Sequence, residues 1–147
     1  IQLGIEEGGT ILTGGTREMT GQVGPTSEGA FLRPTVIDGL DHNSRTSTEE
    51  IFGPVVTIHR FESDEQAIEI ANSTEYGLAG SVWSGDTNRA HEIAQRIETG
   101  IIWVNTWLHR DLRTPFGGVK NSGVGREGGA WSLGFFSEPL NVCIKHD

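Results

Sequence analysis

The sequence predicts an α/β fold whose sheet is only partly contained in the chain. Strand-like and helix-like stretches alternate from Val55 to Val104, which is the order typical of α/β proteins. Residues 101–104 are apolar throughout, as expected for a strand covered on both faces. These strands are too few for a two-sided sheet, so we expect sequence outside these 147 residues to supply the rest.

The first third of the chain is expected to hold short elements. Residues 1–7 are typical of the last turns of a helix, and residues 10–13 form a short apolar stretch. Residues 16–30 are polar and glycine-rich, which favours an exposed loop or hairpin. Residues 31–37 predict a strand, and Pro34 within it favours the edge of a sheet, because proline has no N–H for the ladder.

Two helices carry clear start signals. Ser63 can cap the first turn of one helix while Gln66 reaches back, as in a capping box. Asp86 is the expected cap of the next helix, which Gly100 is expected to end. The expected apolar stripes are Ala67, Ile70 and Ala71 in the first helix and Ala90, Ile93, Ala94 and Ile97 in the second.

The remaining elements follow from composition. Residues 55–61 and 78–83 predict strands. A long loop is expected over residues 105–125, then a helix over residues 126–136 and a short final strand over residues 141–146.

Charge and cysteine content exclude several classes of protein. The net charge is −9, which disfavours nucleic acids and anionic membranes as partners. The single cysteine, Cys143, allows no intrachain disulfide, so we expect a reducing compartment, the cytoplasm. No apolar run approaches the roughly 20 residues of a membrane helix. The chain begins at Ile1 within an apparent helix, without a methionine or a signal-like region, so we expect a truncated protein.

The segment 49–54 is the first candidate site. The Glu50 carboxylate can accept two ribose hydroxyls, as acidic residues do in dinucleotide sites, and Phe52 can pack against a flat ring. The alternative is a polar loop that simply ends at a strand.

The segment 105–118 is the second candidate site, because loops after buried strands are where α/β proteins place ligands. Its aromatic residues, Trp107 and Phe116, can line an apolar tunnel, while Arg110 or Arg113 grips a carboxylate. The alternative is a solvated loop whose arginines face water.

Other chemistries find little support. Residues 123–128 match the pattern G-x-G-x-x-G, but no buried strand precedes them and the expected acidic residue would fall beyond the chain. We therefore expect these glycines to form a turn and a helix start. Cys143 lies in an apolar run and is expected to be a packing residue. The five histidines lack ligand spacing, so no metal site is expected.

Four blocks together resemble the aldehyde dehydrogenase superfamily. They are EIFGP at 50–54, NSTEYGL at 72–78, GIIWVN at 100–105 and PFGGVKNSGVGRE at 115–127. The resemblance implies an α/β NAD-binding domain, an α/β catalytic domain and a small oligomerisation element. Residues 1–138 would be the later, incomplete part of the catalytic domain, and residues 139–147 would be the oligomerisation strand.

The resemblance also implies the chemistry of a longer parent enzyme. In the family a cysteine thiolate attacks a small-molecule aldehyde, NAD or NADP accepts the hydride, and a glutamate activates water. The cysteine and that glutamate lie upstream of the matching blocks, so this chain would contain no catalytic residue. It would be inactive alone and bind no cofactor alone. The parent would be a homo-oligomer, a dimer or a tetramer.

The resemblance assigns roles residue by residue. Glu50 matches the residue that holds the nicotinamide ribose, and Phe52 matches the aromatic residue near the nicotinamide. Leu108, Arg110 and Phe116 match positions that line the substrate tunnel. Asn105 matches an asparagine that supports the active-site loop.

Arg110 departs from family members that oxidise neutral aldehydes, because a guanidinium in a tunnel is costly unless it meets an anion. Residues 105–113 and 135–145 are similar to the branch that oxidises 2-hydroxymuconic or 2-aminomuconic semialdehyde, whose substrates carry carboxylates. The alternative is that Arg110 pairs with Asp111 or with another carboxylate as a clip within the loop.

Two other functions remain open from the sequence. The chain would in one case be a non-catalytic assembly or scaffold module derived from the same family. In the other case it would be an independent nucleotide-binding domain, although no phosphate cradle is visible.

Overall fold

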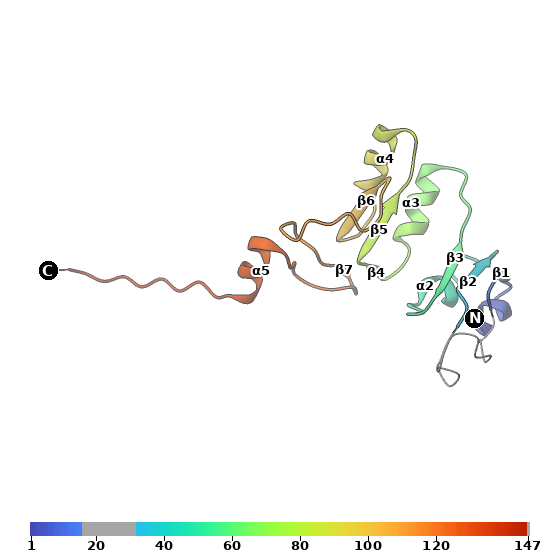
Figure 1. Cartoon of the computed structure of the whole chain (residues 1–147), viewed down its shortest axis with the longest axis horizontal. Coiled ribbons are helices and arrows are strands. Elements are labelled where there is room, and N and C mark those ends of the chain that lie inside the picture. Colours follow the sequence, from blue (N-terminus) through green and yellow to red (C-terminus); the bar gives the residue numbers. More distant parts are fainter. Residues whose placement is uncertain (16–31, 147) are drawn as a thin grey trace, which may run out of the picture. The chain divides into compact units, whose positions relative to one another are not determined.

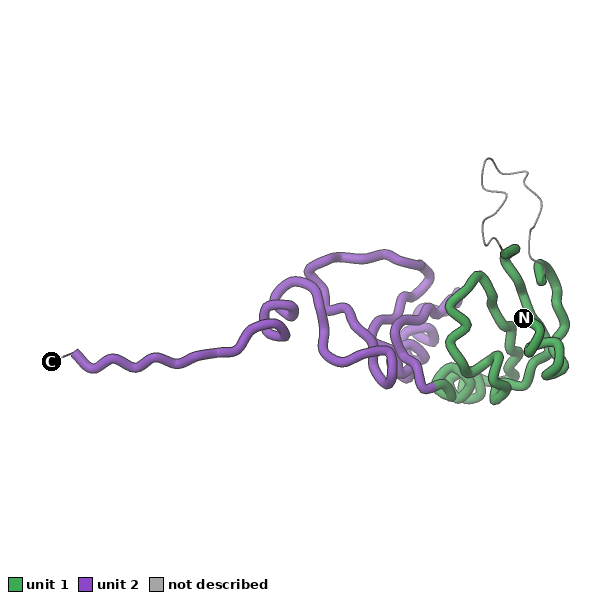
Figure 2. The backbone as a smooth tube through the Cα atoms, turned by 90° about the horizontal axis from the view of Figure 1, so that it is seen from below, with its two compact units in different colours: residues 1–74 green, residues 75–147 purple. Residues whose placement is uncertain are grey.

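The computed structural model describes residues 1–15 and 32–146. The chain forms two compact units, residues 1–74 and residues 75–147 (Figure 2). The first unit contains α1 (Gln2–Glu6), β1 (Thr10–Thr13), β2 (Thr35–Asp38), α2 (Arg45–Thr48), β3 (Val55–Ile58) and α3 (Asp64–Asn72) (Figure 1). The expected loop over residues 16–30 lies outside the described residues.

A three-stranded sheet organises the first unit, in the order β1-β2-β3. β1 runs antiparallel to β2, with Ile11 opposite Ile37, and β2 runs parallel to β3, with Thr35 opposite Val55. The predicted edge position for this stretch is therefore wrong, because β2 is the central strand. Pro34 comes one residue before the first paired residue of β2, so its missing N–H removes no bond between β2 and β3.

Helix α3 begins as its sequence predicts. The Ser63 hydroxyl accepts the Gln66 N–H at 3.2 Å, and the Gln66 side chain accepts the Glu62 N–H at 2.7 Å. The predicted apolar stripe is only partly right. Ile68 is the buried residue of this helix, whereas Ala71 is exposed.

The second unit contains β4 (Tyr76–Gly77), β5 (Ala79–Val82), α4 (Thr87–Ala94), β6 (Ile101–Val104), β7 (Val119–Lys120) and α5 (Gly129–Phe136). Strands β5 and β6 are parallel, with Ala79 opposite Ile101, and β4 pairs antiparallel with β7. The Asp86 carboxylate caps α4 as predicted, accepting the N–H groups of Asn88 and Arg89.

The core of the second unit is small. Helix α4 buries Ala90 and Ala94 and packs against β5 and β6. It ends at Ala94, before the predicted end at Gly100. Trp103 is the buried residue of β6, and the rest of that strand is half-buried. The expectation that β6 is covered on both faces is therefore wrong for this chain, in which its sheet has two strands among the described residues.

The C-terminal part of the second unit has little packing. Helix α5 is shorter than predicted and buries none of its residues. Residues 137–146 carry no helix or strand in the described chain and extend away from α5 (Figures 1 and 2). The predicted strand over residues 141–146 is absent, because no described segment lies beside it as a hydrogen-bonded partner strand. Its pairing with another subunit stays a prediction.

Candidate functional site

The segment 49–54 joins α2 to β3 in the first unit, and we call it the cofactor loop after the role that the family resemblance predicts for it. Helix α2 is short, and its first N–H groups have no partner within the helix. The Glu7 carboxylate supplies the missing acceptors: Oε1 accepts the Arg45 N–H at 2.9 Å and Oε2 accepts the Thr46 N–H at 3.1 Å. Glu7, the residue that follows α1, thus holds the start of α2, which leads into the loop.

The two adjacent glutamates of the cofactor loop differ in their contacts. Arg45 donates to both carboxylate oxygens of Glu49, at 2.7 and 3.1 Å, and this hydrogen bonding holds the pKa of Glu49 below its ordinary value. The Glu50 side chain is exposed and has no hydrogen-bond or ion-pair partner among the described residues. Glu50 is therefore the carboxylate available to a ligand.

Phe52 is presented to solvent by an unusual backbone. Its residue surface is 93% exposed and its φ angle is +52°, a left-handed conformation that bulky residues rarely adopt. Beyond it, the Pro54 carbonyl accepts the Thr35 N–H at 2.8 Å and ties the loop to β2. The loop is therefore anchored at both ends while Glu50 and Phe52 remain open.

The segment 105–118 follows β6 in the second unit, and we call it the substrate loop after the role that the family resemblance predicts for it. Asn105 opens it in a left-handed conformation, with φ of +53°. Its side chain accepts the Ser84 N–H at 2.8 Å and donates to the Ser84 carbonyl at 2.9 Å. Asn105 thus fixes the start of the loop to the loop between β5 and α4.

Aromatic and charged contacts hold the next part of the substrate loop. The Trp103 indole N–H donates to the His109 carbonyl at 2.8 Å, and the Trp103 and Trp107 rings meet edge to face at 5.0 Å. Arg113 donates from Nε to Oδ1 and from Nη2 to Oδ2 of Asp111, and this hydrogen bonding lowers the pKa of that carboxyl. Asp111 is therefore paired with Arg113.

The structure brings Arg110 and Phe116 together and adds a residue that the sequence did not reveal. The Arg110 guanidinium carbon lies 4.1 Å from the centre of the Phe116 ring. Arg110 Nη2 also donates to Glu127 Oε1 at 3.1 Å. Phe116 and Glu127 exchange two backbone hydrogen bonds, at 2.8 and 2.7 Å. The alternative that Arg110 pairs with a carboxylate other than Asp111 is thus realised in this structure.

Leu108, the third predicted tunnel residue, lies on the same loop. It is 64% exposed and its φ angle is +55°. Two of the five predicted site residues, Phe52 and Leu108, therefore adopt backbone conformations that cost energy, as is common at functional sites.

Comparison with known proteins now identifies the family. The model of the aldehyde dehydrogenase family matches residues 1–142. The chain belongs to the aldehyde dehydrogenase family. Its curated relatives include 2-hydroxymuconic semialdehyde dehydrogenase from Pseudomonas putida, 50% identical over 98% of this chain and 29% of that protein.

Other relatives widen the range of named substrates. The 2-aminomuconic 6-semialdehyde dehydrogenase from Pseudomonas sp. is 47% identical, over 99% of this chain and 29% of that protein. Geranial dehydrogenase from Castellaniella defragrans is 47% identical, over 98% of this chain and 28% of that protein. Betaine aldehyde dehydrogenase from Staphylococcus aureus, solved in complex with NAD⁺, superposes with a TM-score of 0.85 at 39% identity. That match covers 92% of this chain and 26% of the solved chain.

The chain therefore spans about 29% of the length of the first of these relatives. Its fold is a partial aldehyde dehydrogenase fold, in agreement with the incomplete α/β sheet that the sequence predicts. The branch that the sequence resembles also agrees with the first two relatives.

The glycines at 123–128 form turns, as predicted, in this aldehyde dehydrogenase segment. Gly125 and Gly128 have φ angles of +73° and +98°, and Gly128 precedes the first residue of α5. A Cβ atom on Gly125 would lie 2.1 Å from the Phe135 ring. These glycines are needed for close packing, and the strand before them, β7, has two residues.

Cys143 is exposed in the described structure, so the expectation that it is a packing residue is wrong for this chain. It lies in residues 137–146, which carry no helix or strand in the described part of the chain. Among the described residues, no group of three or more His, Cys, Asp or Glu side chains is placed to hold a metal ion. None of the described helices has the length and apolar character needed to cross a membrane.

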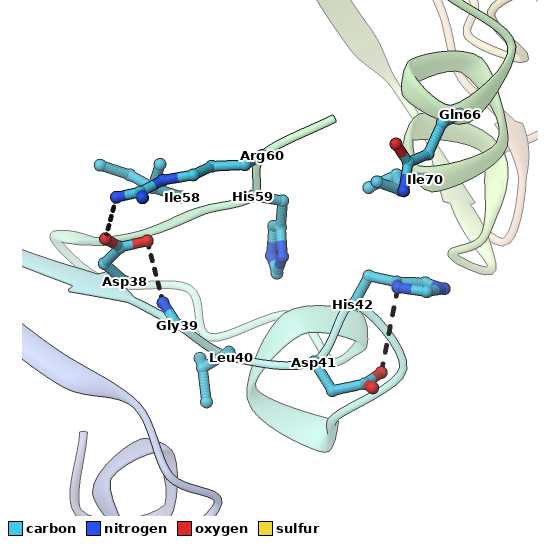
Figure 3. Close-up of a pocket in the computed structure, with 10 residues that line it drawn as sticks. All are labelled: Asp38, Gly39, Leu40, Asp41, His42, Ile58, His59, Arg60, Gln66 and Ile70. Carbon is cyan, nitrogen blue, oxygen red and sulfur yellow. Dashed lines mark hydrogen bonds and ion pairs between the residues drawn. The ribbon is translucent and has the colours of Figure 1, made fainter. Parts of the chain in front are cut away.

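A hollow of about 320 Å³ lies at the carboxyl ends of β2 and β3, opposite the cofactor loop on the same strands (Figure 3). Several of its polar side chains have local partners. Asp38 pairs with Arg60 at 2.7 Å, His42 lies 3.9 Å from Asp41, and His59 contacts Thr57 at 3.1 Å. The sequence did not single out this hollow, and its polar groups do not converge on a common point in Figure 3.

Proposed function

We propose that this chain is the C-terminal segment of an NAD(P)-dependent aldehyde dehydrogenase that oxidises an aldehyde to a carboxylic acid in the cytoplasm. Residues 1–138 would form the later part of the catalytic domain, and residues 139–147 would pair with another subunit. The family match over residues 1–142 is the observation that carries the proposal. The 29% coverage of the relatives supports the assignment to a part of the enzyme.

The cofactor loop would contact the nicotinamide end of NAD(P). The cofactor, when bound, accepts a hydride. A free carboxylate at Glu50 suits the two hydroxyls of a ribose, and the exposed ring of Phe52 suits a flat aromatic surface. The solved relative with NAD⁺ supports this cofactor class.

The substrate loop would contact the aldehyde through Leu108, Arg110 and Phe116. Arg110 would bind a carboxylate of the substrate, which would be a semialdehyde such as 2-hydroxymuconic or 2-aminomuconic semialdehyde. A guanidinium has five N–H donors, and Glu127 accepts a hydrogen bond from Nη2, so donors remain for a bidentate carboxylate. The names of the two Pseudomonas relatives support this substrate class.

A neutral aldehyde is the second candidate substrate. Geranial, named for one relative, carries no carboxylate. The contact between Arg110 and Glu127 suits such a substrate, because it already neutralises the guanidinium. Under this alternative Arg110 would only clip the loop.

Replacing Arg110 in the full-length enzyme distinguishes the two substrates. Hexanal and 6-oxohexanoate have the same chain length and differ at the far end, a methyl group against a carboxylate. We expect Arg110→Ala to lower kcat/KM for 6-oxohexanoate about 10- to 100-fold, as expected for a lost charged hydrogen bond, and to change hexanal far less. An unchanged preference between the two would defeat the carboxylate assignment.

The isolated chain is expected to be inactive, because the reacting cysteine and the general base would lie elsewhere in the enzyme. Incubating it with NAD⁺ and hexanal should give no increase in absorbance from NADH. Exposed apolar residues on α5 and the tail, such as Trp131, Leu133, Leu140 and Ile144, should make it self-associate. Turnover by this chain alone would refute the assignment to an inactive segment. A stable monomer in light scattering would contradict the expected self-association.

A family-derived scaffold module would share these surfaces. The gene sequence upstream of the codon for Ile1 distinguishes the scaffold module from the enzyme segment, because a scaffold module would have its own start codon near Ile1. An upstream reading frame that encodes a nucleophilic cysteine would support the enzyme.

A further inference from the structure

We propose that Glu127 is a specificity-determining residue of this site. It holds the Arg110 guanidinium when no anionic substrate is present and gives it up to a substrate carboxylate. The inference rests on the proposed role of Arg110 and adds a second residue to it. Glu127 belongs to the family block at 115–127 but was not among the site residues predicted from the sequence.

The backbone brings the parts of this exchange together. The two hydrogen bonds between Phe116 and Glu127 fix an aromatic ring and a carboxylate at opposite positions of one short antiparallel bridge. Arg110 reaches both: its guanidinium lies 4.1 Å from the ring centre, and Nη2 lies 3.1 Å from the carboxylate. The ring and the carboxylate therefore act on the same cation.

The contact with Glu127 is suited to exchange. It joins one nitrogen to one oxygen, and the two side chains are 37% and 59% exposed. Exposed ion pairs of this kind contribute little to stability. A carboxylate that approaches the guanidinium in the bidentate geometry gains two parallel hydrogen bonds and can displace such a partner.

The Phe116 ring keeps the guanidinium in place during the exchange. A cation over an aromatic face is attracted to it whichever anion lies beside it. The charge of Arg110 is then compensated in both states, by Glu127 in the empty site and by the substrate in the occupied site. Glu127 therefore competes with the substrate, and its removal should favour anionic aldehydes.

A neighbouring pair provides the control. Arg113 and Asp111 lie on the same loop and form an ion pair with several contacts between the two side chains. Asp111→Asn removes one negative charge from the same loop without touching Arg110 or Phe116. An effect that merely follows the net charge of the loop would appear in this variant too.

The test uses Glu127→Gln in the full-length enzyme with 6-oxohexanoate and hexanal. We expect the ratio of the KM for 6-oxohexanoate to the KM for hexanal to fall about threefold to fivefold, the size of one exposed ion pair. The fall should lie in KM and not in kcat, and it should shrink as salt is added. Asp111→Asn should not reproduce it. An unchanged or raised ratio would overturn the exchange.

A crystal structure of the unmodified enzyme with adipate tests the same point if the variant does not fold. We expect an adipate carboxylate on Arg110 and a distance from Arg110 to Glu127 beyond hydrogen bonding. Adipate on Arg110 with the Glu127 contact intact would refute the exchange. If Arg110→Ala abolishes the preference for 6-oxohexanoate while Glu127→Gln changes nothing, only the exchange fails. If Arg110→Ala changes nothing, the substrate assignment itself fails.

Discussion

The cofactor loop and the substrate loop use opposite means to hold the side chains that we predict to be functional. In the cofactor loop, neighbours provide the support: Glu7 caps α2 and Arg45 binds Glu49, while Glu50 has no partner among the described residues. In the substrate loop, the functional residues support one another, with Arg110 between Phe116 and Glu127. We therefore expect mutations to separate support from the predicted function in the first loop and to affect both together in the second.

The largest expected difference is in the stability effect of replacing two glycines, because the space available for a Cβ atom differs between them. A Cβ atom on Gly100 would lie 1.5 Å from the carbonyl oxygen of Gly117, in the substrate loop, whereas a Cβ atom on Gly53 meets nothing closer than 4.0 Å. We expect Gly100→Ala to lower the free energy of unfolding by about 3 kcal/mol. Gly53→Ala should be neutral or stabilise by up to about 1 kcal/mol. Urea unfolding followed by circular dichroism measures both, and equal effects would contradict the packing difference.

Asn105 should show how strongly the start of the substrate loop is fixed. Asn105→Ala removes two hydrogen bonds to Ser84, so we expect a loss of about 2 kcal/mol in the free energy of unfolding. Asn121→Ala is the control, since it removes a single exposed side-chain contact to Glu75, and should cost less than about 1 kcal/mol. Thermal unfolding of the two variants compares these losses. A smaller loss of stability for Asn105→Ala than for Asn121→Ala would show that the two hydrogen bonds between Asn105 and Ser84 contribute little.

The two adjacent glutamates test the separation of support and function. Glu50→Gln in the full-length enzyme should raise the KM for NAD⁺ about tenfold, because the charged hydrogen bonds to the ribose are weakened. Glu49→Gln should raise it less than about twofold, because the Arg45 contact is exposed. Initial rates at varied NAD⁺ give both values. Equal increases would mean that Glu50 has no direct contact with the cofactor.

The smallest expected effect is the dependence of the cofactor loop on pH. Hydrogen bonds from Arg45 hold the pKa of Glu49 below its ordinary value of 4.5. A lowered pKa in the folded state means that this stabilisation is complete at neutral pH and is lost as the pH falls below that value. Arg45→Met should return the pKa of Glu49 to its ordinary range, which carboxyl ¹³C NMR titration measures. An unchanged pKa in Arg45→Met would show that another group lowers it.

The sequence predicted best what depends on neighbours in the chain. The caps at Ser63 and Asp86 form because each side chain reaches N–H groups two or three residues away. The family blocks identified the fold from residue identity, and Glu50, Phe52 and Phe116 were predicted as site residues from the same blocks. Arg110 was predicted from the loop between two of these blocks, residues 105–113.

The sequence could not predict what depends on distant pairing. Pro34 favoured an edge strand, but the partners of β2 are set by β1 and β3 on either side. Arg110 meets Glu127, 17 residues away, only because the Phe116–Glu127 bridge brings the chain back. Ile68 is the buried residue of α3 and Ala71 is exposed, so the helical period alone did not give the inner face of this helix.

The left-handed backbone at Phe52 and Leu108 restricts how such an enzyme can diversify. Valine, isoleucine and threonine tolerate a φ angle near +50° poorly, so these positions exclude them whatever the substrate requires. Directed evolution of the aldehyde preference should therefore accept glycine, asparagine or unbranched side chains at position 108 and reject branched ones. New substrate specificities would have to arise at neighbouring positions whose φ angles are negative and therefore accept β-branched residues.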